Sequence, residues 1–357
     1  MDINYSIAFY SVGNNLEHLK IPFTHIQLAT NDFSNKYRIA KLLGGCALYI
    51  AELEHYDKEN PSSNRPNTVL IKRYPPSGNE WYGEKEFLRE IEILSGVVKH
   101  PNIVNLLGFC FEESEMILVI DNFSNGFLCE YLGNLKDKRV LTWEKRLKIC
   151  IDVAHALRYI HSELEDQKMI IKRDINSFNI GLDEYFGAKI TDFWWSVFLP
   201  PNQDDEALYL DPIGRHYYVD PEYKETCKVK RESDVYGFGV VLFEILCGRL
   251  ASDPIYIKES DMGLAHVARR SFSIRSLEEM IDPIIKEEIG ENKFVLNRGP
   301  NKDSLHTFIT IAHQCVAETQ AQRPTMEVVV NELEKALFFQ VSHPSNFKLW
   351  IPRSKTV

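Results

Sequence analysis

Hydrophobic and polar positions alternate in short runs along the first third of the chain. Such alternation is typical of half-buried β-strands, and the polar segments between the runs predict turns. The predicted strands span residues 37–45, 48–54, 68–74, 103–112 and 116–123. Before the fourth run, the apolar positions Phe87, Ile91, Leu94 and Val98 are three or four residues apart, which predicts a helix within 79–98. The pattern therefore indicates a small, mostly antiparallel sheet accompanied by one helix.

Beyond the fifth predicted strand, the hydrophobic pattern has the period of helices. Leu147, Ile151, Ala154, Leu157 and Ile160, for example, lie on one face of a long predicted helix. The main predicted helices span residues 143–161, 233–248, 304–318 and 325–339. The second of them is apolar on almost every side, which is typical of a helix at the centre of a larger helical lobe.

These two patterns divide the chain into a β-rich part and a helical part. We expect an N-terminal extension (1–34), a small lobe (35–121), a larger helical lobe (122–340) and a loosely ordered C-terminal tail (341–357). Within the extension, a short amphipathic helix is predicted from its apolar positions Phe23, Ile26, Leu28 and Ala29.

Composition narrows the classes of function. The 357 residues are 44% hydrophobic and carry a net charge of −10, which argues against binding of nucleic acid through a basic surface. No apolar run is long enough to cross a bilayer, and the first residues lack the pattern of a signal peptide. Asp2 excludes the N-myristoylation pattern. We therefore expect a cytoplasmic protein without direct insertion into a membrane, recruited to the plasma membrane through partners.

The cysteines support the same expectation. There are seven, each isolated in the sequence and none in a C-x-x-C pair. They are Cys46, Cys110, Cys129, Cys150, Cys227, Cys247 and Cys315. An odd count without paired spacing predicts reduced, mostly buried thiols and no zinc site.

Several short strings then resemble the motifs of protein kinases. They are "VLIK", "KRDINSFNI", "TDFW", "YYVDPEY", "SDVYGFG" and "QRPTM". The resemblance covers about residues 30–340 and rests on many independent strings. It implies an α+β, bilobal fold in which a small antiparallel β-rich lobe with one regulatory helix joins a larger helical lobe.

The resemblance also assigns roles to particular residues. It implies that Lys72 and Glu90 form the ion pair that positions phosphates, and that Asp174 is the catalytic base. Contacts to ATP and Mg²⁺ are implied for Gly44 and Gly45 of the phosphate-covering loop, for Ile120 and Asn122 of the hinge, and for the metal ligands Asn179 and Asp192.

Three further residues have roles in the scaffold. The resemblance implies that Asp234 holds the catalytic loop and that Glu222 pairs with Arg323.

Three other strings narrow the resemblance. "LATNDFS", "HPNIVNLLGFC" and "LTWEKRLKICIDVAHALRYIH" are similar to the plant receptor-like cytoplasmic kinases of the RLK/Pelle type. Within that family the chain is most similar to the immune pseudokinases related to the HopZ-ETI-deficient protein. This implies an adaptor whose partners are a nucleotide-binding leucine-rich-repeat immune receptor and receptor-like cytoplasmic kinases.

The chain departs from the kinase pattern at the places where phosphate chemistry occurs. The loop that should read G-x-G-x-x-G-x-V is three residues short, so we expect an ordinary tight hairpin there. Asn176 replaces a Lys that contacts the terminal phosphate. Lys172 replaces a buried His, and it should either reach solvent or find a carboxylate, because a buried unpaired ammonium is costly.

The segment after the metal-binding turn departs as well. Trp194 replaces Gly and, with Trp195, belongs either to the core or to an interface. From Asp192 to Glu222 the only Ser or Thr is Ser196, so Arg173 has no obvious phosphate partner. The acidic residues 204–206 offer it a charged substitute, or form a solvated loop. Arg215 and Tyr217 replace small residues, and should hinder a peptide from crossing the site.

Three functions fit this sequence. The first is a pseudokinase adaptor in plant innate immunity, and the second is a weakly active ATP-dependent serine/threonine kinase. The third is a binding module gated by a nucleotide. The scaffold motifs are intact while the chemical motifs have changed, which favours the adaptor and leaves binding of ATP and Mg²⁺ open.

Overall fold

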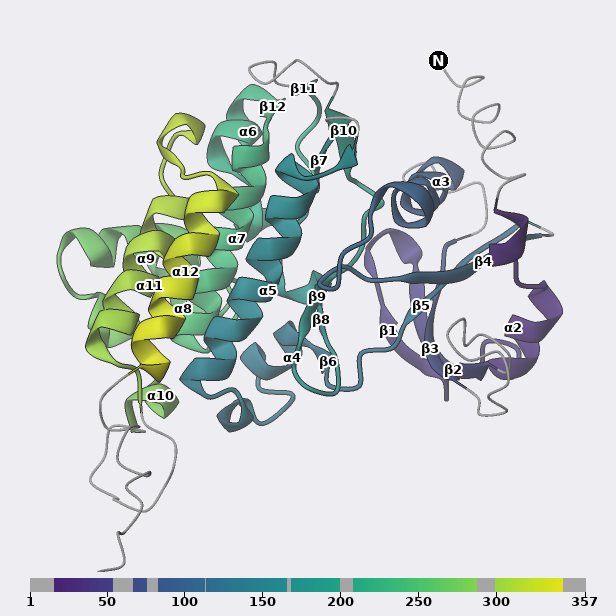
Figure 1. The fold of residues 1–357 in the computed structure, drawn as a ribbon, viewed down its shortest axis with the longest axis horizontal. Helices are drawn as coiled ribbons and strands as arrows, with labels where there is room; N and C mark the ends of the chain where they lie inside the picture. Colours follow the sequence, from purple (N-terminus) through teal and green to yellow (C-terminus); the bar gives the residue numbers. More distant parts are fainter. Residues whose placement is uncertain are drawn as a thin grey trace, which may run out of the picture.

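A computed structural model of the chain describes residues 16–53, 67–75, 83–112, 114–165, 168–199, 208–287 and 299–342. It has two lobes: a twisted sheet with helix α3 on one side of the molecule, and a group of helices on the other (Figure 1). The predicted α+β, bilobal fold is confirmed. Most of the polar segment between the second and third predicted strands (residues 55–67), and the tail beyond residue 342, lie outside the described residues.

The small lobe is built on one antiparallel sheet of five strands in the order β1-β2-β3-β5-β4. The strands are β1 (Arg38–Lys41), β2 (Ala47–Leu53), β3 (Asn67–Arg73), β4 (Leu106–Glu112) and β5 (Glu115–Asp121). All five match predicted runs. The alternation of hydrophobic and polar positions predicts these strands because each strand places alternate side chains on opposite faces of the sheet.

Each face of this sheet is covered by a helix. Helix α3 (Glu84–Glu92), continued by a π-helical turn at Ile93–Val97, packs on one face through its predicted apolar stripe. The short helix α2 (Phe23–Ala29), also predicted, lies on the other face with Ile26 fully buried and Leu28 pointing outward. The segment that we expected to be an extension therefore contributes to the core of the small lobe.

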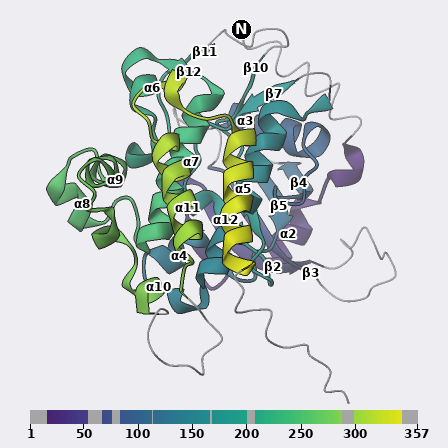
Figure 2. The ribbon, with the colours of Figure 1, turned by 60° about the vertical axis from the view of Figure 1, so that its left-hand side comes forward.

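The large lobe is organised around helix α7 (Arg231–Cys247). Every residue from Ser233 to Cys247 is buried, as expected for a helix that is apolar on nearly all sides. Helices α5 (Trp143–Ser162) and α11 (Lys302–Cys315) pack against it, and α12 (Met326–Val341) packs against α5 and α11 (Figure 2).

Shorter elements complete the large lobe. The helices are α4 (Leu128–Leu132), α6 (Pro221–Thr226), α8 (Pro254–Glu259), α9 (Leu264–Ser273) and α10 (Pro283–Glu287). The strands are β6 (Gly126–Phe127), β7 (Met169–Ile171), β8 (Ile180–Leu182), β9 (Ala188–Ile190), β10 (Val197–Leu199), β11 (Leu208–Tyr209) and β12 (Lys228–Val229). Strands β7 to β9 bring two predicted segments to the junction of the two lobes (Figure 1). They are the catalytic loop (172–180) and the metal-binding turn (191–194). None of the described helices is long and apolar enough to span a membrane.

Candidate active site

A cavity of about 560 Å³ lies between the lobes. Its apolar lining includes Leu48 of β2, Ile120 of β5 and Phe123. Its polar lining includes the predicted site residues Lys72, Asp174, Asn179 and Asp192. A volume of this size is typical of small-molecule sites. In the part of the chain that the structure describes, the predicted contacts Gly44, Gly45 and Asn122 do not line this cavity.

Lys72 of β3 is the central cation of the cleft. Its ammonium lies 2.7 Å from Glu90 of α3 and 2.6 Å from Asp192, so one side chain ties the small lobe to the metal-binding turn. Burial by itself would lower the pKa of Lys72, but Asp192 and Glu90 outweigh it and hold the pKa above its ordinary value. The ion pair that the sequence predicted is therefore formed, and Lys72 stays charged.

A second group holds Glu90 in place. Tyr74, two residues after Lys72 on the same side of the strand, donates its hydroxyl to Glu90, and the backbone amide of Phe193 donates to the same carboxylate at 3.0 Å. No motif in the sequence pointed to Tyr74. Its two-residue spacing from Lys72 could have predicted that the two side chains lie together, because alternate residues of a strand share a face.

The catalytic loop is held from below by Asp234 of α7. Its carboxylate accepts the backbone amides of Lys172 and Arg173 at 2.7 Å each, and it lies 2.8 Å from His161. Arg173 has a positive φ of 68°, which turns the chain so that Asp174 faces the cavity. Asp234 thus has the scaffold position that the resemblance implied.

The two carboxylate oxygens of Asp174 are both engaged. Oδ1 accepts the amide of Asn176 and Oδ2 accepts the amide of Asn179, each at 2.8 Å. Burial raises the pKa of Asp174, while Lys172 and the bond from Asn179 oppose that rise. Asn176 therefore supplies a neutral donor to Asp174, and adds no positive charge to the polar lining of the cleft.

Lys172 contradicts the sequence expectation. It is fully buried, and it pairs with no carboxylate among the described residues. Its ammonium donates to the backbone carbonyl of Asp192 and lies 5.1 Å from the centroid of the Phe193 ring. The carbonyl dipole and the ring face together replace a counter-charge. Burial lowers the pKa of Lys172, against the opposing effect of Asp174.

The predicted phosphate-covering loop is a tight hairpin. Strand β1 pairs with β2 up to Lys41, opposite Ala47, and the amide of Leu42 donates to the carbonyl of Cys46 at 2.8 Å. Gly44 and Gly45 take φ values of 67° and 83°, which a side chain would disfavour. The hairpin is closed by its own backbone, and Cys46 fills its underside as a buried thiol whose pKa is raised to about 12 by burial.

Comparison with known proteins identifies this arrangement. Residues 48–333 match the family model described as protein tyrosine and serine/threonine kinase. The chain belongs to this kinase family. The match spans both lobes and includes Lys72, Asp174 and Asp192.

Three receptor-like protein kinases of Arabidopsis thaliana are among the relatives of this chain. FERONIA is 35% identical over 326 residues (91% of this chain, 33% of FERONIA), and ANXUR2 is 38% identical over 272 residues (76% of this chain, 30% of ANXUR2). HERK 1 is 35% identical over 338 residues (93% of this chain, 37% of HERK 1). The chain spans about a third of the length of these relatives. Its similarity is thus to plant receptor-like kinases.

Kinases of this family generally use ATP and Mg²⁺, and the residues of the cleft fit them. Asp192 and Asn179 present carboxylate and amide oxygens, the ligands that Mg²⁺ prefers, in the same polar lining of the cavity as Lys72. Mg²⁺ would be held by these two residues and would neutralise phosphate charge. The roles of Asp174 as base and of the two metal ligands remain predictions.

The predicted pair of Glu222 and Arg323 is not formed. Arg323 instead donates to Asp220 at 2.6 Å, with both side chains fully buried, while Glu222 accepts the backbone amide of Gln320 at 2.6 Å. Asp220 lies just before helix α6 and is closer to the large-lobe core than Glu222, which is partly exposed. The sequence identified the right segments and the wrong acid.

The two tryptophans belong to the core. Trp194 is 3% and Trp195 8% exposed, and their rings stack with centroids 5.0 Å apart. The Trp194 ring also lies 4.7 Å from the ammonium of Lys72 and borders the cavity. Arg173, near the pair, donates to the carbonyl of Asp211 and the hydroxyl of Tyr223. The acidic residues 204–206 lie outside the described residues.

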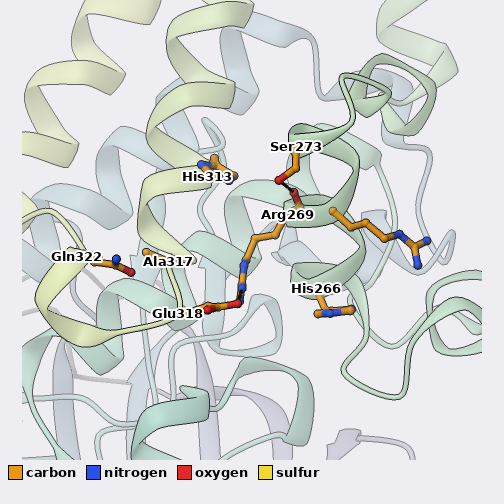
Figure 3. A pocket seen from close by; sticks show the side chains of 8 residues that line it. His266, Arg269, Ser273, His313, Ala317, Glu318 and Gln322 are labelled. Carbon is orange, nitrogen blue, oxygen red and sulfur yellow. Dashed lines mark hydrogen bonds and ion pairs between the residues drawn. The ribbon is translucent and has the colours of Figure 1, made fainter.

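A second hollow, of about 370 Å³, lies on the large lobe between α9 and the end of α11. Figure 3 shows Arg269 reaching Glu318 across it, and Arg270 of the same helix pairs with Glu259. Burial lowers the pKa of His313, which stacks on Phe272. Because acids already neutralise both arginines, this hollow is a poorer anion site than the cleft.

Proposed function

We propose that this protein is a pseudokinase adaptor in plant innate immunity, whose output is binding and not phosphoryl transfer. It would link a nucleotide-binding leucine-rich-repeat immune receptor to receptor-like cytoplasmic kinases that a pathogen effector has modified. In this proposal it works in the cytoplasm and reaches the plasma membrane through its partners.

The observation that carries the proposal is the short hairpin between β1 and β2. An active kinase needs backbone amides of a glycine-rich loop to approach the phosphates. Here Leu42 and Cys46 close the turn on itself, and Gly44 and Gly45 lie outside the cavity wall. The cleft therefore lacks the lid that would order the reacting phosphate.

A second observation supports the loss of chemistry. Asn176 is engaged with Asp174 and is neutral, so one electrostatic contact to the transferring phosphate is missing. Removal of a single contact of this kind typically raises the barrier by about 2.7–4 kcal/mol. The partner classes come from the resemblance of the sequence to immune pseudokinases.

Phosphotransfer is the direct test. The purified protein is incubated with labelled ATP and Mg²⁺ beside its Asp174→Ala variant, with an active serine/threonine kinase as the positive control. We expect incorporation by the wild-type protein to equal that of the variant. Incorporation that depends on Asp174 would overturn the proposal.

The alternative is a weakly active serine/threonine kinase. It is favoured by one observation: the ion pair between Lys72 and Glu90 is formed, and Asp174, Asn179 and Asp192 line one cavity. In planta, the adaptor predicts that Lys72→Ala leaves immune output intact. Loss of output, with binding to the receptor retained, would support the kinase instead.

A further inference from the structure

Arg215 forms part of the polar wall of the cleft. It lines the same cavity as Asp174 and Asp192. Its guanidinium lies 3.8 Å from the centroid of the Phe178 ring, which also lines the cavity, and stacking of this kind fixes the direction of the side chain. The sequence alone suggested only that Arg215 is bulky. The structure places its charge inside the cleft.

The backbone before Arg215 fixes its closeness to the catalytic loop. Gly214 has a φ of 114°, and a Cβ at this residue would lie 3.2 Å from Oδ1 of Asp174 and 3.4 Å from the carbonyl of Arg173. Only glycine readily takes this conformation. The chain therefore passes directly beside the Asp174 carboxylate, and Arg215 follows within one residue.

The guanidinium of Arg215 is available to a ligand. Within the part of the chain that the structure describes, the guanidinium of Arg215 has no hydrogen bond and no ion pair, whereas Lys72 is held by Glu90 and Asp192. Lys136, also on the cavity wall, is paired with Glu130. An arginine that is stacked but unpaired presents its donors in a fixed fork, which suits the oxygens of a phosphate.

The lining of the cavity indicates which kind of phosphate Arg215 would contact. The apolar lining, with Leu48 and Ile120, suits a flat ring, and the polar lining suits a phosphate chain. Lys72 comes from strand β3 of the small lobe, whereas Arg215 follows Gly214, which lies beside the Asp174 carboxylate of the large lobe. A chain of three phosphates has one more group than a chain of two with which to contact both cations.

We propose that Arg215 binds the terminal phosphate of a nucleoside triphosphate in the cleft, and so provides the cation that Asn176 does not. The residue would make the cleft selective for a triphosphate over a diphosphate. This inference goes beyond the proposed function, because it concerns binding of a nucleotide and requires no transfer of phosphate. If the protein bound no nucleotide, the proposed adaptor function would stand and this inference would be wrong.

Equilibrium binding tests the inference. Dissociation constants of Mg-ATP and Mg-ADP are measured by calorimetry for the wild-type protein and for Arg215→Ala. Loss of a charge-assisted contact should weaken Mg-ATP binding by about tenfold or more and leave Mg-ADP within about twofold. Arg215→Lys, which keeps the charge without the planar fork, should fall between the two for Mg-ATP.

Arg139→Ala is the matched control, because it removes an arginine whose side chain is 79% exposed and does not line the cavity. It should change neither constant. Circular dichroism and melting temperature establish that each variant is folded. Equal weakening of both nucleotides, unchanged Mg-ATP binding in Arg215→Ala, or no binding of nucleotide by the wild-type protein would each overturn the inference.

Discussion

Lys172, Asn176 and Trp194 each differ from the kinase pattern, and each is accommodated by a different neighbour. Lys172 donates to the carbonyl of Asp192, Asn176 donates to Asp174, and Trp194 stacks on Trp195. All three contacts are made within the loop and the turn that lie beside the cleft. The three residues therefore stabilise one arrangement of the catalytic loop and the metal-binding turn.

Trp194 gives the first prediction at this scale. Replacement by Ala removes a buried ring from its contacts with Trp195 and Lys72, so the free energy of unfolding should fall by about 3–5 kcal/mol. Denaturant unfolding measures it. Tyr185→Ala is the control, because that ring is 82% exposed and its loss should change stability by less than about 0.5 kcal/mol. A small change in the free energy of unfolding would contradict the core position of Trp194 and favour an interface.

Arg323 gives the second. Double-mutant cycles of Arg323→Met with Asp220→Asn, and with Glu222→Gln, compare the observed partner with the acid that the sequence suggested. Because the pair with Asp220 is fully buried, its coupling energy should exceed about 1.5 kcal/mol, while that of Glu222 should stay below about 0.5 kcal/mol. The larger coupling falling on Glu222 would refute the pairing seen here.

At the scale of the element, helix α7 shows how an apolar helix accommodates a charged residue type. Glu244 is fully buried, accepts the hydroxyl of Tyr218 and the amide of Ala251 through Oε1, and has no partner for Oε2 among the described residues. Burial raises its pKa to about 7. The side chain is thus favoured as a neutral acid inside the helix core.

This predicts a pH dependence of stability. Because the pKa of Glu244 is higher in the folded state than its ordinary value of 4.5, the folded state binds more protons, and stability should fall as pH rises from about 4.5 to about 7. Glu244→Gln should remove this contribution, on the order of 1–3 kcal/mol. Chemical unfolding of both proteins at pH 5 and pH 7.5 measures the difference. Identical pH profiles would show that Glu244 does not titrate in this range.

At the scale of the whole molecule, one hydrophobic cluster runs through both lobes, and polar links between the lobes add to it. The pair of Lys72 and Asp192 is one, and the bond from Arg89 to the carbonyl of Ser196, at 2.9 Å, is another. No covalent link adds to them in the described structure, because all seven cysteines are free thiols. Packing and these polar contacts alone stabilise the molecule.

The thiols can be tested directly. Burial raises the pKa of Cys150, Cys247 and Cys315, among others, and the thiolate is the reactive form. Most of the seven should therefore resist alkylation in the native protein and react once it is unfolded, as mass spectrometry can count. A reducing agent should leave the melting temperature unchanged. A marked drop would indicate a disulfide and contradict the free thiols.

Much of this protein could be predicted from local sequence. The five strands of the sheet and helices α2, α3, α5, α7, α11 and α12 follow from hydrophobic periods of two and of about 3.6 residues, because each element must bury one face or all of itself. The tight hairpin at Gly44 and Gly45 also follows, since a loop that is three residues short cannot arch over a ligand.

Partners across the fold could not be predicted in the same way. That Arg323 meets Asp220 and not Glu222, that Lys172 finds a carbonyl, and that Trp194 is buried depend on how distant segments pack. A side chain's hydrogen bonds and burial are set by its spatial neighbours, which local propensity does not encode. By itself the sequence determined the elements, the kinase motifs and the short hairpin. Tertiary structure alone decided which charges are neutralised, and among the described residues it gives the guanidinium of Arg215, on the cavity wall, no ion pair.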